Sequence, residues 1–60
     1  MQDDTLNERD WKVLRLLEER GRVQLTWDDR IRLKKLGYVQ GNAMLCWLTR
    51  KGIQAVQEAA

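Results

Sequence analysis

The chain is short of the residues that most enzymes and metal sites use. Its 60 residues include no histidine and a single cysteine, Cys46. A lone cysteine cannot form an intramolecular disulfide, and the chain lacks the cysteine and histidine ligands of a zinc site. Without histidine or a glycine-rich loop of phosphate-binding spacing, the sequence offers no nucleophile–base pair and no Walker-type site. We therefore expect no enzymatic activity, no cofactor and no small-molecule substrate.

Long apolar segments are also missing. The longest uninterrupted apolar run is residues 43–48, whereas a membrane-spanning helix needs about 20 residues. The first ten residues, MQDDTLNERD, are acidic, unlike the basic and apolar start of a secretory signal. We expect a cytoplasmic protein with no membrane partner. It should form one domain over residues 1–60, with residues 1–4 disordered.

Charge is distributed unevenly along the chain. Residues 1–19 contain three basic and six acidic side chains, whereas residues 20–35 contain six basic and two acidic ones. The net charge of +2 predicts little by itself. Basic charge concentrated in the middle of the chain, however, creates a local field that attracts polyanions. The simpler alternative is a solvated helix face.

The first segment predicts a helix over about residues 6–20. Thr5 and Glu8 have the spacing of a capping box, in which each side chain bonds to the backbone of the other residue. Leu14 and Leu17 belong to one apolar stripe on the helical wheel. Gly21 follows the last turn, as a residue that ends a helix often does.

The second segment predicts a short strand and a second helix. Residues 23–25, VQL, alternate apolar and polar side chains, which is enough for a very short strand. Thr26 then precedes WDDRIRLKKLG. An N-capping threonine, acidic residues in the first turn and lysines before Gly37 together predict a helix. Ile31 and Leu33 lie on different sides of its wheel, which indicates a helix that is short, irregular at its start or contacted on two sides.

After Gly37 the pattern changes to two strands and a last helix. YVQ and MLCWLT predict the strands, and Gly41-Asn42 between them supplies the positive φ that a tight hairpin turn requires. Thr49 then caps a closing helix. The sequence therefore predicts an α+β fold in the order helix, short strand, helix, β-hairpin, helix. The residues expected to be buried together are Leu14, Leu17, Leu33, Leu48 and Val56.

Two segments that flank the predicted hairpin resemble the winged-helix family of helix-turn-helix proteins. In that family a recognition helix ends in Leu-x-x-x-Gly-aromatic/aliphatic-Val, and the second wing strand leads through Leu-Thr-x-x-Gly into a closing helix. The first pattern is matched here by Leu33, Gly37, Tyr38 and Val39. The second is matched by Leu48, Thr49, Gly52 and Val56.

The resemblance covers nearly the whole chain, with two departures. Only one helix fits between Gly21 and Gly37, where the family has two, and Ile31 lies six residues before Gly37 rather than seven or eight. The chain therefore resembles a minimal or truncated winged helix. The resemblance implies a DNA-binding regulator, of the kind common among small bacterial and phage proteins.

The basic residues of the second helix and the hairpin base are the candidate nucleic-acid contacts. Arg30 and Lys34 are one turn apart, so in a major groove they could meet phosphates or guanine edges. The alternative is that these cations serve solubility and offset the helix dipole at its C-terminal end. The full candidate set is Arg30, Arg32, Lys34, Lys35, Arg50 and Lys51.

The second hairpin strand favours a different function. In MLCWLT both alternating sets are apolar: Met44, Cys46 and Leu48 on one face, and Leu45 and Trp47 on the other. Leu48 leads into the closing helix and is placed inward, which leaves Leu45 and Trp47 on the outer face unless that helix folds back over them. We expect these two residues to anchor a protein partner or a homodimer. The alternative function is thus a protein-interaction or dimerisation module without a DNA role.

Overall fold

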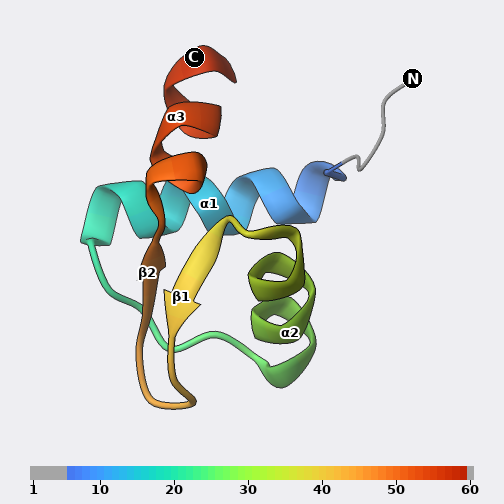
Figure 1. The fold of residues 1–60 in the computed structure, drawn as a ribbon, viewed down its shortest axis with the longest axis vertical. Helices are drawn as coiled ribbons and strands as arrows, with labels where there is room; N and C mark the ends of the chain where they lie inside the picture. Colours follow the sequence, from blue (N-terminus) through green and yellow to red (C-terminus); the bar gives the residue numbers. More distant parts are fainter. Residues whose placement is uncertain (1–5, 60) are drawn as a thin grey trace.

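The structure is a computed structural model that describes residues 6–59, so the disorder expected for residues 1–4 lies outside the described residues. Three helices and one antiparallel hairpin form the fold, which confirms the α+β class (Figure 1). In the view of Figure 1, α1 crosses the molecule, α2 and the hairpin lie below it, and α3 rises above it. The elements are, in chain order, α1 (Glu8–Arg20), α2 (Trp27–Leu36), β1 (Val39–Gly41), β2 (Cys46–Leu48) and α3 (Arg50–Ala59).

Helix α1 begins later than its sequence predicts. Its N-cap is Asn7, whose side-chain oxygen accepts the amide of Asp10 at 2.8 Å, while the Asp10 carboxylate accepts the Asn7 amide at 3.1 Å. This is a complete capping box two residues beyond the predicted pair of Thr5 and Glu8, so the predicted start near residue 6 is wrong. Asparagine caps at least as well as threonine. Thr5 itself lies outside the described residues.

Helix α2 has the boundaries that its capping residues predict. The Thr26 hydroxyl accepts the amide of Asp29 at 3.3 Å, and Gly37 ends the helix in the left-handed conformation with φ of 89°. A residue with a side chain adopts that conformation only at a cost, which glycine avoids. Leu33 is fully buried while Ile31 is exposed, so within this chain α2 is contacted mainly on one side.

The strands form a two-stranded sheet, and a single bridge lies on the other side of β2. On one side β2 pairs antiparallel with β1, with Val39 opposite Leu48. On the other side Cys46 exchanges two backbone hydrogen bonds with Val23, at 2.9 and 3.0 Å. The short strand predicted at residues 23–25 is therefore present as a single bridge.

The hairpin turn differs from the predicted one. Gly41 has a positive φ of 129°, but no other residue type between 6 and 59 takes a positive φ, so Asn42 does not share that role. Instead the Asn42 side-chain oxygen accepts the amides of Met44 and Leu45, at 2.9 and 3.0 Å. These bonds hold both residues in the turn. Met44 is 70% exposed, so its predicted place on the inner face of the strand is wrong.

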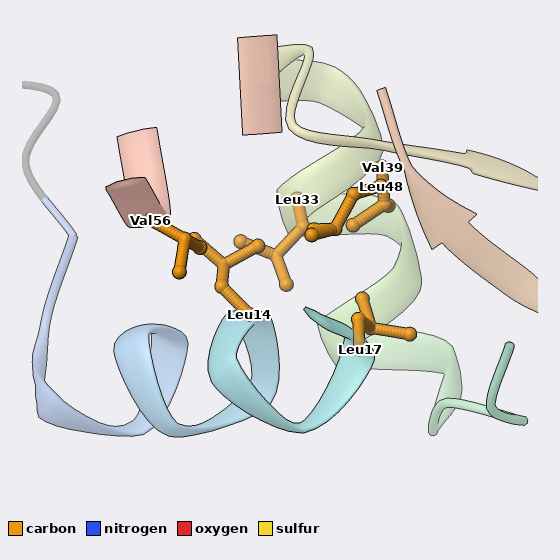
Figure 2. Packing of buried hydrophobic residues seen from close by; sticks show 6 residues of the cluster. All are labelled: Leu14, Leu17, Leu33, Val39, Leu48 and Val56. Carbon is orange, nitrogen blue, oxygen red and sulfur yellow. The ribbon is translucent and has the colours of Figure 1, made fainter. Parts of the chain in front are cut away.

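The core joins all three helices to the hairpin. Leu14, Leu17, Leu33, Leu48 and Val56 are buried in one cluster, as predicted, and Val39 completes it. Figure 2 shows Leu14 and Leu17 pointing from α1 toward the other four side chains. Gly52, in the first turn of α3, lies against the Tyr38 carbonyl, and a side chain there would collide with that oxygen. Its glycine therefore lets α3 start close to the hairpin.

Replacing Leu17 by alanine should lower the free energy of unfolding by about 2 to 5 kcal/mol, because the truncation leaves a cavity in a cluster where Leu17 is 1% exposed. That is a large share of the stability of a small domain. Met44→Ala, at an exposed site, is the control and should change it little. Equal denaturation midpoints for Leu17→Ala and wild type would contradict this core.

Candidate nucleic-acid interface

Two crossed ion pairs hold α1 and α2 together. Arg9 of α1 donates to Asp29 of α2 through both Nε and Nη2, at 3.1 and 2.9 Å. Arg32 of α2 donates in return from Nε to the two carboxylate oxygens of Asp10, at 2.9 and 3.2 Å. Each aspartate is also the third residue of its helix, next to the capped amide end where negative charge is favoured. The start of α1 is thereby bonded to both the start and the middle of α2.

One of these two ion pairs gives Arg32 a structural role. Its partner Asp10 is almost fully buried, with a side chain 2% exposed, and a buried carboxylate needs a charged partner. The Nε edge of Arg32 is therefore occupied within the chain, although 47% of the side chain remains exposed. Among the six predicted contacts, Arg32 is thus the one bound to a carboxylate across residues 6–59.

The ion pair with Arg9 also sets the ionisation of Asp29. The hydrogen bonds from Arg9 lower the pKa of the Asp29 carboxyl below its ordinary value of 3.8, with a further contribution from the Thr26 hydroxyl and with partial burial acting in the opposite sense. The same interaction raises the pKa of Arg9. Both groups are therefore charged at neutral pH.

The face of α2 that points away from α1 mixes apolar and basic side chains. Positions i, i+3, i+4 and i+7 lie on one side of a helix, and here they carry the four residues that we call the α2 outer face: Trp27, Arg30, Ile31 and Lys34. Trp27 is 66% exposed and Ile31 is 38% exposed. Arg30 is half-buried and Lys34 is exposed. Asp29 and Leu33 occupy the opposite, buried side.

The hairpin lies beside this face. The Lys34 ammonium group donates to the Gly41 carbonyl at 3.4 Å in an exposed contact, so α2 reaches the end of β1 just before the turn (Figure 1). The turn itself presents Met44 and Leu45, which is 41% exposed. Exposed apolar side chains thus occur both on the α2 outer face and in the hairpin turn.

The remaining predicted basic residues lie elsewhere. Lys35 is exposed, one position and about 100° around the helix from Lys34. Lys51 donates to the Leu36 carbonyl at 2.8 Å and lies 4.8 Å from the Tyr38 ring centroid, so it caps the C-terminal end of α2. Arg50 is exposed at the start of α3. The structure thus brings Arg30 and Lys34 together and places Arg50 and Lys51 at the other end of the hairpin.

Trp47, one of the two predicted partner anchors, is half-buried. It lines an open groove of about 370 Å³ between the end of α1, β2 and α3. The Arg22 guanidinium lies over its ring, 5.3 Å from the centroid. Helix α3 reaches this side of β2 through Ile53, which lines the same groove. Leu45 lies in the turn, so the structure places the two predicted anchors in different surroundings.

Trp27 and Ile31 were missed as candidate site residues. Their spacing of four residues puts them on one helix side, and Leu33 lies out of phase with them. This difference in helical phase was the sequence feature that could have identified Trp27 and Ile31 as exposed. A helix with one buried side must expose the apolar residues of its other side.

Comparisons with known protein families, with curated proteins and with solved structures find no match to this chain. No group of three or more His, Cys, Asp or Glu side chains within residues 6–59 is arranged to hold a metal ion. None of the three helices described is long and apolar enough to cross a membrane.

Acid should weaken the link between α1 and α2. Because the folded pKa of Asp29 lies below the ordinary 3.8, its contribution to stability is fully present above that pH and is lost as the pH falls through the lower, folded value. As the pH falls from 5 to 2.5, the free energy of unfolding should therefore decrease less for Asp29→Asn than for the wild type. Denaturant titrations across this range measure it.

Asp28→Asn is the matched control, since Asp28 is adjacent, exposed and in neither ion pair. It should follow the wild-type pH dependence more closely than Asp29→Asn does. Identical curves for wild type and Asp29→Asn would show that the bond to Arg9 contributes nothing to stability.

Proposed function

We propose that this protein is a small nucleic-acid-binding regulatory protein of the winged-helix type, which contacts DNA through α2 and the hairpin. The observation that carries the proposal is the α2 outer face, on which Lys34 is exposed and Arg30 is half-buried between Lys34 and the buried side of the helix. Phosphate contacts supply most of the affinity of such proteins, and basic side chains on one helix side make them together.

The arrangement of elements supports the same proposal. A bridge at Val23 and strand β1 flank β2, a helix precedes the hairpin and another follows it. This is the order expected of a winged helix in which α2 takes the place of the recognition helix. The crossed ion pairs with α1 support α2 where the family has an additional helix.

The positive charge is spread so that a polyanion could span α2 and its C-terminal end. Across residues 6–59 the two ion pairs use Arg9 and Arg32, which leaves Arg30, Lys34 and Lys35 of α2 outside them. Arg50 and Lys51 lie where α2 ends and α3 begins, within reach of a flanking phosphate backbone. Asp28 is the exposed carboxylate on α2.

A second candidate is a protein-interaction module, favoured by the exposed apolar residues. Trp27, Ile31, Met44 and Leu45 are all more than a third exposed, and they lie on α2 and in the hairpin turn. Exposed apolar groups that share a surface are typical of protein interfaces. In this second candidate a partner or a second copy of the chain would cover the same surface.

Binding to a short duplex, followed by fluorescence anisotropy at several salt concentrations, tests the proposed function. Affinity should fall steeply with salt, and Arg30→Ala combined with Lys34→Ala should make the slope of log K against log salt shallower by about 1.8, since each lost phosphate contact removes about 0.9. Lys12→Ala combined with Arg15→Ala removes the same charge from exposed positions of α1 and should reduce the slope much less.

Absence of binding by the wild type to both a duplex and a single strand at low salt, or equal effects of the two double variants, would contradict the proposal. In that case sedimentation of the wild type beside Trp27→Ala tests the second candidate. Self-association that depends on Trp27 would favour it.

A further inference from the structure

Basic charge alone does not account for the α2 outer face. Of its four residues, two are cationic and two are large and apolar, and Trp27 has two thirds of its surface exposed. Covering an exposed indole with a ligand removes apolar surface from water and is favourable. A ligand that is both anionic and flat or apolar would complement this face.

Paired DNA offers such a face little to contact. In a duplex the base faces are stacked on each other, and the groove presents polar base edges, with the thymine methyl as the main apolar group. Arg30 and Lys34 have partners there, whereas the Trp27 ring has only its single N–H to donate. Unpaired bases, by contrast, present their π-faces, on which aromatic side chains stack whatever the sequence.

We propose that the α2 outer face binds unpaired nucleic-acid bases, with the Trp27 indole stacked on one base and with Arg30 and Lys34 on the flanking phosphates. This inference rests on the proposed function and names a single strand, or an unpaired stretch, as the ligand of the same surface. Trp27 and Lys34 are seven residues apart, a rise of about 10 Å along α2. The face is thus long enough for a base and the phosphates on either side of it.

The charge of α2 selects nucleic acid rather than a protein as the ligand. Outside the ion pairs, α2 has three cations, Arg30, Lys34 and Lys35, and the single carboxylate of Asp28. The Lys34 contact with the Gly41 carbonyl is exposed and long, at 3.4 Å, so its ammonium group can exchange that oxygen for a phosphate. A polyanion with exposed aromatic faces complements both halves of the surface.

The test compares a mixed-sequence single-stranded oligonucleotide with a duplex of the same sequence, for the wild type and four variants. Loss of the stack in Trp27→Ala should weaken single-strand binding by about 5- to 150-fold, with the salt slope unchanged because no charge is lost. Trp27→Phe keeps a stacking ring and should retain most of the affinity. Met44→Ala, which removes an exposed apolar side chain from the hairpin tip, is the matched control and should bind like wild type.

Trp27 is mostly exposed, so its replacement should leave the melting temperature close to that of wild type. Trp27→Gln supplies a second variant without an aromatic ring should Trp27→Ala fold poorly. Single-strand affinity that equals or exceeds duplex affinity, and that falls in both non-aromatic variants, supports the inference. Duplex binding stronger than single-strand binding and unchanged by Trp27→Ala overturns the inference while the proposed function stands. Failure to bind either nucleic acid at low salt overturns both.

Discussion

The two reciprocal arginine–aspartate ion pairs between α1 and α2 are the interaction on which the rest of the structure depends. Asp10 is almost fully buried, and its carboxylate is paired with Arg32 and also accepts the Asn7 amide. Asp29 and Arg9 repeat the contact in the opposite direction. Together with Leu33 in the core, these bonds set which side of α2 faces α1. The side that remains is the outer face.

The fixed orientation of α2 explains why one helix can carry two unlike surfaces. Its inner side supplies Leu33 to the core and Asp29 to an ion pair, whereas its outer side supplies a tryptophan, an isoleucine and two cations. Arg30 and Arg32 are two residues apart, and Arg32 bonds to Asp10 whereas Arg30 is in neither of the ion pairs described within residues 6–59. Nearby residues of equal charge therefore have different roles, and only geometry separates them.

Local features of this fold could be predicted from the sequence and long-range ones could not. Thr26 and Gly37 mark the ends of α2 because capping depends on neighbours in the chain, and the five predicted core residues follow from helix and strand periodicity. The Arg9–Asp29 pair joins residues 20 positions apart, and no local pattern selects that partner. The position of Met44 was predicted wrongly because the Asn42 side chain accepts the Met44 amide and holds this residue in the turn. For the site, Arg30 and Lys34 were predicted, whereas the exposure of Trp27 depends on which side α1 covers.

The most direct test of the central claim, that the ion pairs leave the α2 outer face as the binding surface, is chemical-shift mapping of the ¹⁵N-labelled protein during titration with an oligonucleotide. The largest changes should occur at the Trp27 indole and at the amides of Arg30, Ile31 and Lys34. Largest changes at Trp47 and Ile53 in the groove beside α3, with the α2 outer face unchanged, would contradict the account.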